Sequence, residues 1–156
     1  MDRKFLLAFR LLMGWTFLYA GAWQVLSPTF SAADFLAHTK TFHDLYAPLT
    51  SPAIAPVLTF FVKWGHLLIG LSLVSGLLVR VSAPFGIMLM LLYWTAHMDF
   101  PYIENVNSYL VDYHIVYAGV LVYLIVKRAG HVFGLDGWVA KLASVQQAPA
   151  LRWMVA

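Results

Sequence analysis

Residues 55–79, APVLTFFVKWGHLLIGLSLVSGLLV, decide the fold class of this chain. Lys63 is the one charged side chain in this stretch, and a helix of roughly 20 apolar residues spans a bilayer core of about 30 Å. Three further apolar segments lie at residues 5–26, 82–98 and 108–126. The sequence therefore predicts an all-α membrane protein, built as a four-transmembrane-helix bundle.

The composition supports this prediction. Of the 156 residues, 62% are hydrophobic and only 11% are charged, against roughly a quarter charged in a typical soluble domain. The chain has no cysteine, which excludes a disulfide scaffold, a dithiol redox motif and a thiolate-bound iron–sulfur cluster. The net charge is +3, but the basic residues flank apolar segments, so the expected partner is the lipid bilayer and not nucleic acid.

The basic residues also predict the orientation of the bundle. Most of them fall on one side of the four segments: Arg3, Lys4, Arg10, Arg80, Lys127, Arg128, Lys141 and Arg152. By the positive-inside rule this side faces the cytoplasm. Both termini are therefore expected in the cytoplasm, and the two longer loops outside.

The segments suggest two regions of the chain. Residues 1–128 are expected to form the transmembrane domain, with an amphipathic segment near residues 31–46 on the outer membrane surface, where Ser31 resembles a helix N-cap. Pro84 is expected to start the third helix. Residues 129–156 are predicted to be a basic cytoplasmic tail.

One face of the first segment is distinctive. Arg10, Gly14, Phe17, Gly21 and Gln24 recur at three- and four-residue spacing, so they share a face of the helix. Two glycines on one face let a neighbouring backbone approach closely. The basic side chain on the same face, like Arg80, is expected to fix topology.

Ionisable and polar side chains gather in the outer half of the predicted bundle. They come from all four segments: Gln24, Lys63, His66, His97, Asp112 and His114. Ionisable groups at membrane depth usually mark functional sites. A structural ion pair between Lys63 and Asp112 is an alternative, because buried charges are usually paired. The histidines could equally serve as helix contacts or interfacial anchors.

The spacing of these residues weighs against a metal. No segment holds a His-x-x-x-His pair or a carboxylate–histidine pair at three-residue spacing, so no metal site is predicted, although a haem ligated by two histidines across helices stays open. A quinone needs an apolar slot, aromatic walls and groups that bond its oxygens, and a histidine–aspartate pair can carry its protons. The predicted catalytic residues are Lys63, His66, Asp112 and His114. The predicted quinone-binding residues are Gln24, Trp64, Tyr93 and His97.

Three stretches of the chain resemble a known family. They are RLLMGWTFLYAG at residues 10–21, WGHLLIGLSL at 64–73 with GLLVR following at 76–80, and DYHIVYA at 112–118 with AG and GLD further on. These stretches, in this order, are similar to the DoxX/DoxD family of small membrane proteins. The resemblance implies a four-helix membrane bundle. The family includes the small subunit of thiosulfate:quinone oxidoreductase, which works with a second subunit. His66 stands where many relatives are expected to carry glutamate.

Two functions are weighed from these observations. The first is a component of an oxidoreductase in a prokaryotic plasma (inner) membrane, which passes electrons to quinone from thiosulfate or another sulfur compound. The second is an accessory subunit that does no chemistry in a larger membrane complex. Both imply a second protein subunit or a homo-oligomer. A solute carrier is less favoured, because the sequence shows neither an inverted repeat nor a broken helix.

Overall fold

The computed structural model describes residues 2–155 and is mostly helical. Its four long helices are α1 (Asp2–Leu26), α4 (Ala55–Ser75), α5 (Val79–Ala96) and α6 (Tyr113–Val126). Within the described residues, α1, α4 and α5 are long and apolar enough to cross a membrane, and α6 is a shorter apolar helix. The predicted all-α membrane fold is confirmed.

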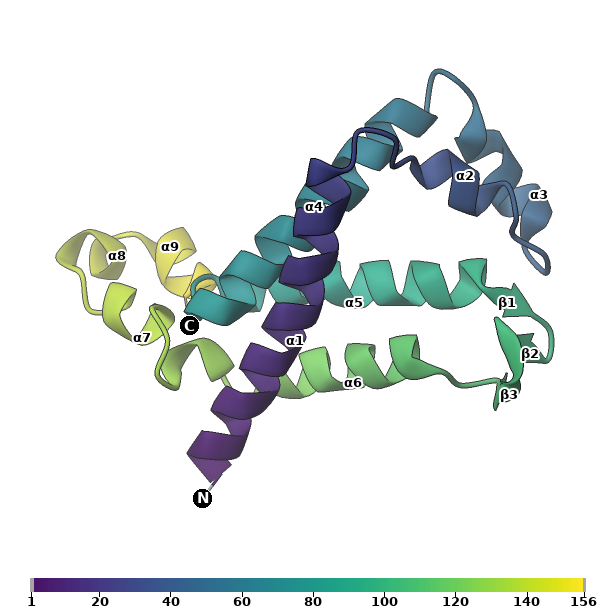
Figure 1. Cartoon of the computed structure of the whole chain (residues 1–156). Helices are drawn as coiled ribbons and strands as arrows, with labels where there is room; N and C mark the ends of the chain where they lie inside the picture. The colour runs from purple at the N-terminus through teal and green to yellow at the C-terminus, as the bar shows by residue number, and fades with distance from the viewer. Residues whose placement is uncertain (1, 156) are drawn as a thin grey trace.

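The long helices form two antiparallel pairs (Figure 1). α1 packs mainly on α4, and α5 packs mainly on α6. The two pairs diverge towards the end that carries the longer loops, and both termini lie towards the opposite end. We call the loop-bearing end the outer end, because the distribution of basic residues predicts that it faces outward.

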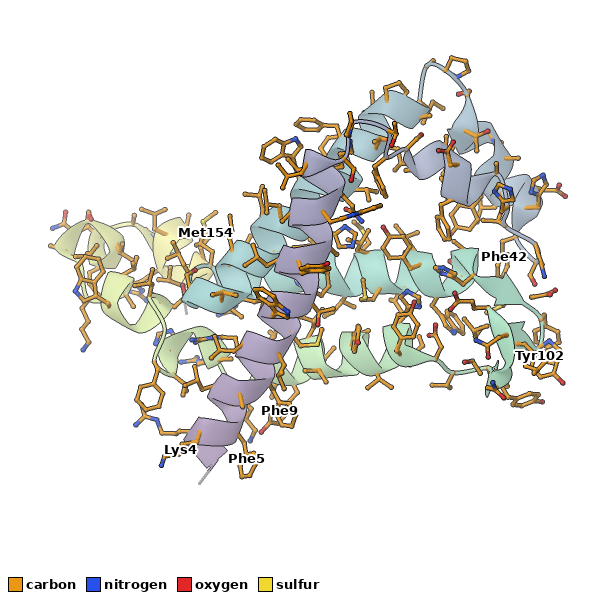
Figure 2. The ribbon with its side chains drawn as sticks, viewed as in Figure 1. Lys4, Phe5, Phe9, Phe42, Tyr102 and Met154 are labelled. Atoms are coloured by element: carbon orange, nitrogen blue, oxygen red, sulfur yellow. The ribbon has the colours of Figure 1, made fainter. Side chains whose placement is uncertain are left out.

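Glycines allow the close packing of α1 on α4. A methyl group on Gly21 would collide with the backbone of Leu67, and one on Gly70 would collide with the backbone of Leu18. The glycine face predicted for the first segment therefore does bring a neighbouring backbone close. On the face of α1 that points away from the other helices, Phe5 and Phe9 are exposed, where the bilayer would cover them (Figure 2).

A short helical layer covers the outer end between α4 and α5 (Figure 1). The single amphipathic helix expected near residues 31–46 is divided in two: the first helix ends at Leu36 and the next begins at His43. Ser31 does cap that helix, accepting the N–H of Ala33 at 3.2 Å. The layer consists of α2 (Ala32–Leu36), α3 (His43–Tyr46) and the 3-10 helix η1 (Ala47–Thr50). Residues 31–50 are called the outer cap below.

The loop between α5 and α6 folds into a small antiparallel sheet that the sequence analysis did not predict. Its strands are β1 (Met98–Asp99), β2 (Tyr102–Ile103) and β3 (Asn105–Tyr109). The predicted start of the fourth span at residue 108 is therefore wrong. Residues 105–109 pair with β2 instead, and the helix begins only after Asp112 caps it. Asp112 thus lies at the outer end of α6 and not a turn inside it.

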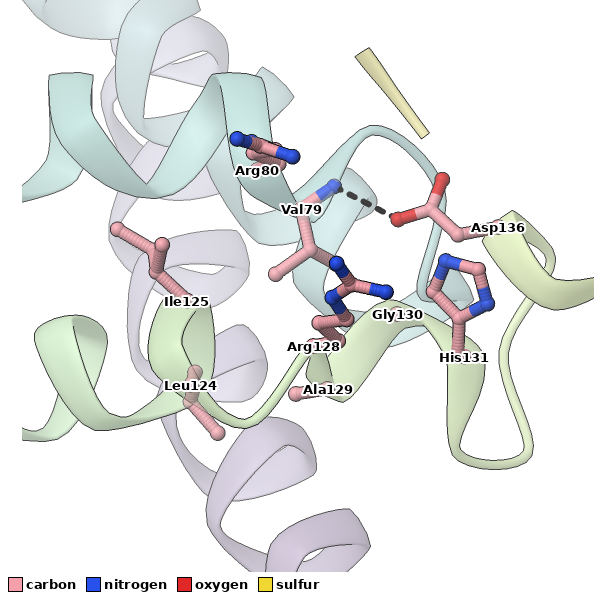
Figure 3. A pocket seen from close by; sticks show the side chains of 9 residues that line it. All are labelled: Val79, Arg80, Leu124, Ile125, Arg128, Ala129, Gly130, His131 and Asp136. Atoms are coloured by element: carbon pink, nitrogen blue, oxygen red, sulfur yellow. Dashed lines mark hydrogen bonds between the residues drawn. The ribbon is translucent and has the colours of Figure 1, made fainter. Parts of the chain in front are cut away.

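The connection between α4 and α5 also differs from the prediction. α4 ends at Gly76, whose φ of 69° is left-handed and suits glycine. α5 then begins at Val79, so Pro84 lies inside this helix and does not start it. The cause is Asp136, whose carboxylate accepts the N–H group of Leu78 at 2.6 Å. It also accepts the N–H group of Val79 at 3.2 Å (Figure 3). This carboxylate caps α5 from a distant part of the chain.

The C-terminal segment packs against the end of the bundle opposite the outer end. It contains η2 (Ala129–His131), α7 (Asp136–Val139), α8 (Ala143–Gln147) and α9 (Pro149–Met154). The buried guanidinium of Arg10 donates to the carbonyl oxygens of Ala129 at 2.6 Å, Val132 at 2.9 Å and Phe133 at 3.1 Å. Arg10, predicted only to fix topology, therefore anchors this segment to α1.

Candidate functional site

Most of the predicted site residues meet in the outer half of the bundle. The ring of Tyr93 lies 5.6 Å from that of His66 and 5.7 Å from that of His114, measured between centroids. His97 stacks on His114 at 5.0 Å, and Asp112 bonds His114. These five residues form one continuous layer across α4, α5 and α6, which we call the histidine layer.

Asp112 holds His114 through two hydrogen bonds. Its carboxylate accepts the backbone N–H of His114 at 3.0 Å, and this contact caps α6. The other carboxylate oxygen lies 2.6 Å from Nδ1 of the same residue. Both side chains are buried. Because an ionised carboxylate can only accept, Nδ1 carries the proton and Nε2 remains for another partner.

The other two histidines of the layer are oriented by the same principle. Nδ1 of His66 lies 2.8 Å from the carbonyl oxygen of Val62, and Nδ1 of His97 lies 2.9 Å from that of Tyr93. A carbonyl oxygen only accepts, so each Nδ1 donates. In the neutral imidazole, each Nε2 is then a hydrogen-bond acceptor.

A cavity of about 140 Å³ lies against this layer. It has walls from all four long helices: Thr16, Phe17, Ala20, His66, Met90, Tyr93, Tyr113, His114 and Tyr117. Thr16 on α1 and Tyr113 on α6 are exposed on the surface of the bundle. The cavity therefore opens sideways between α1 and α6, towards the lipid. We call it the histidine pocket.

Gln24 lies on α1, next to the hydroxyl group of Tyr93 in this layer. It is buried, and its Oε1 has no hydrogen-bond partner among residues 2–155. The side chain is not part of the wall of the histidine pocket. Gln24 is thus near the predicted site without lining it.

Two predicted site residues lie elsewhere. The ammonium of Lys63 donates to the carbonyl oxygen of Ser27 at 3.2 Å and lies 5.5 Å from the ring centroid of Phe30. The alternative pairing with Asp112 is therefore not formed, because the lysine reaches back to the end of α1. Trp64 is exposed and packs on Phe60 on the surface of α4, so it does not enter the pocket.

Two aromatic residues complete the site although the sequence analysis did not select them. The ring of Tyr113 lies 4.1 Å from that of His114. Phe35 of the outer cap lies 4.6 Å from His97. The amphipathic pattern near residues 31–46 was the available signal for the second of these. The position of Tyr113 depends on where α6 begins, because Tyr113 is the first residue of that helix.

A second polar pocket lies at the end of the bundle opposite the outer end, around Asp136 (Figure 3). Its lining includes Val79, Arg128 and His131. Its volume is only about 10 Å³, which is space for about one water molecule. Burial raises the pKa of the Asp136 carboxyl, and the N–H groups of Leu78 and Val79 oppose that shift. This pocket belongs to the cap of α5 and is too small for a substrate.

Comparison with known proteins identifies the family. The family model described as DoxX matches residues 5–98, which is more than half of the chain. The chain belongs to the DoxX family. No curated protein and no solved structure matches it significantly. The matched region of this DoxX protein includes His66, Tyr93 and His97, whereas Asp112 and His114 lie beyond it.

The geometry defines the chemistry available to this DoxX protein. His66 and His114 both line the pocket, and each has Nδ1 occupied by an acceptor. Their Nε2 atoms accept from a hydroxyl when the rings are neutral and donate to a carbonyl when the rings are protonated. Asp112 stabilises a positive charge on its neighbouring imidazole. Among residues 2–155, no group of three or more histidines and carboxylates is arranged to hold a metal.

Proposed function

We propose that this DoxX protein is the quinone-binding subunit of an oxidoreductase in a prokaryotic plasma membrane, and that it passes electrons to quinone. The observation that carries the proposal is the histidine pocket. Imidazoles, a tyrosine and further aromatic rings converge there on a space that opens towards lipid. A quinone dissolves in the bilayer, so it would reach this pocket from the lipid.

The residues of the pocket fit the head of a quinone. Phe17, Tyr113 and Tyr117 offer aromatic walls for a flat ring. His66 and His114 offer the groups that bond ring oxygens. The pocket itself has a volume of about 140 Å³.

Proton transfer is the role we assign to the chain itself. A bound quinone supplies the capacity to take two electrons and two protons. Protonated His114 donates a proton from Nε2 while Asp112 holds its other nitrogen, and His66 serves the same role from α4. Asp112 lies at the outer end of α6, so replacement protons would come from the outer aqueous side.

Electron delivery is assigned to a second subunit. The chain has no cysteine, and the described residues offer no metal-holding group. We therefore propose that a partner brings the two electrons for each quinone from an inorganic sulfur compound, such as two thiosulfate ions, which lose one electron each as they join through a new S–S bond. The sulfur donor follows from the family resemblance, and the partner from the chemistry that the chain lacks.

Quinone content tests the proposal. The full chain is purified in mild detergent, and extractable quinone per chain is measured for the wild type, His66→Gln and His114→Gln. The matched control is His38→Gln, an exposed histidine of the outer cap. We expect near-stoichiometric quinone in the wild type and the control, and a loss of tenfold or more in the two pocket variants. Folded protein without quinone would overturn the proposal and favour the accessory subunit.

A further inference from the structure

A larger cavity lies beneath the outer cap, and Tyr93 lines it as well as the histidine pocket. Its volume is about 290 Å³, and hydrocarbon side chains form most of its wall, among them Leu36, Leu49, Leu58, Val62 and Ala96. It exists because the two helix pairs diverge at the outer end and the cap bridges the gap (Figure 1). We call it the apolar cavity.

The apolar cavity has few polar lining groups. Tyr46 lines it, but the Tyr46 hydroxyl is bonded to Thr95 Oγ1 at 2.6 Å and lies 3.2 Å from the carbonyl oxygen of Leu92. The remaining polar lining groups are Tyr93 and His97 of the histidine layer. A polar solute would find few partners here, and water does not fill a space lined by hydrocarbon.

The apolar cavity and the histidine pocket share a wall. Tyr93 lines both of them. His97 lines the apolar cavity and stacks on His114, which lines the pocket. A molecule with a polar ring and a hydrocarbon tail would match this pair of spaces, both lined by Tyr93.

We propose that the apolar cavity binds the first isoprenoid units of the quinone tail while the ring occupies the histidine pocket. This inference rests on the proposed function and names the part of the substrate that gives affinity. Binding pockets for small molecules usually measure roughly 300–1,000 Å³. The pocket of about 140 Å³ falls well below that range, and the adjoining 290 Å³ supplies the missing volume.

Filling the apolar cavity tests the inference. Leu58→Trp places a larger side chain in the cavity from α4. Leu68→Trp is the matched control, because it makes the same change on the same helix at an exposed position. The probes are 2,3-dimethoxy-5-methylbenzoquinone without a tail and the same ring with one or two isoprenoid units, titrated against the full chain in lipid nanodiscs.

The tail dependence of binding is the readout. Each buried methylene strengthens binding by roughly fourfold, so Leu58→Trp should reduce the gain from the isoprenoid units by at least tenfold. Tail-free quinone should bind this variant as it binds the wild type. Partition into lipid is common to all variants and cancels. Equal tail dependence in Leu58→Trp and wild type would overturn the inference and leave the proposed function standing. Tail-free quinone that fails to bind the wild type would overturn both.

A second measurement needs no variant. A quinone with a photoreactive diazirine on its first isoprenoid unit is irradiated with the wild-type protein, and the labelled peptides are mapped. Labels on residues 36–49, 58–62 or 89–97 support the inference. Labels confined to exposed positions such as Leu68 would overturn it, as would a phospholipid acyl chain retained in the cavity in place of the prenyl probe.

Discussion

The carboxylate of Asp112 lies 2.6 Å from Nδ1 of His114, two residues further along the chain, and it also caps the helix on which this histidine lies. One side chain thus sets the start of α6 and the tautomer of the imidazole. The start of an apolar helix and the orientation of a candidate proton-transfer group are therefore coupled at this point.

Substitution of Asp112 should separate these two roles. Asparagine caps helices about as well as aspartate, whereas alanine loses about 1 kcal/mol. Thermal unfolding in one detergent should therefore show Asp112→Asn close to wild type and Asp112→Ala destabilised. Both variants should lower quinone-dependent turnover by about tenfold or more, because neither supports a charged imidazole. Full turnover in the asparagine variant would show that the Asp112 carboxylate caps α6 and has no role in proton transfer.

Replacing Lys63 should leave quinone binding intact. Its ammonium is bonded to the carbonyl of Ser27, away from the histidine pocket. We expect Lys63→Met to hold as much quinone per chain as wild type, whereas His114→Gln loses it. The same quinone extraction measures both. A loss of quinone in Lys63→Met equal to that in His114→Gln would show that Lys63 contributes to quinone binding.

The packing of α1 on α4 should be sensitive at one glycine and tolerant at another. Gly70→Ala forces a methyl group against the backbone of Leu18, which we expect to cost about 1–3 kcal/mol. Gly65→Ala, on the same helix, faces open space and should not destabilise the protein. Unfolding midpoints of the two variants provide the comparison, and equal midpoints would contradict the observed helix contact.

Arg10→Met should release the C-terminal segment. The change leaves the buried carbonyl oxygens of Ala129 and Val132 without their donor, and each unsatisfied group costs about 1–3 kcal/mol. We expect limited proteolysis to cleave residues 129–155 faster than in the wild type. Lys4→Met, an exposed change on the same helix, is the control. Identical cleavage in all three proteins would rule out this anchor.

Asp136 should make stability depend on pH in a defined direction. Burial raises the pKa of its carboxyl in the folded state, so the folded protein holds the proton more tightly than the unfolded chain. The contribution of Asp136 to the free energy of unfolding is complete below the unfolded pKa of about 3.9. It declines as the pH rises through the folded pKa. The Tm of the wild type should thus fall relative to that of Asp136→Asn as the pH rises from about 4 to about 7. A rise in the Tm of the wild type relative to Asp136→Asn over this range would contradict the direction of the pKa change.

Local sequence signals predicted parts of this structure well. Ser31 was identified as a helix cap from its own position and its neighbours. The start of α5 could not be predicted in this way, because the carboxylate that caps it comes from Asp136, far along the chain. The start of α6 was placed too early for a similar reason. Residues 105–109 pair with β2, and this pairing depends on how the loop turns.

The candidate site shows the same division. His66, Tyr93, His97, Asp112 and His114 were selected from the chain because polar and ionisable side chains are costly in lipid unless they face a partner. Lys63 satisfied the same criterion, yet its long side chain reached the carbonyl of Ser27. The membrane depth that the sequence predicts for a residue does not reveal which neighbour its flexible side chain contacts.

The sequence by itself determined that this chain is a helical membrane protein and which side chains had to be removed from lipid. Those properties follow from the free energy of transferring each group into hydrocarbon, which depends on residue type and spacing. The tertiary structure decided which of these groups meet. Two diverging helix pairs brought three histidines to one layer beside Tyr93 and left two cavities that it lines, because helix crossing and loop pairing join residues that are distant in the chain.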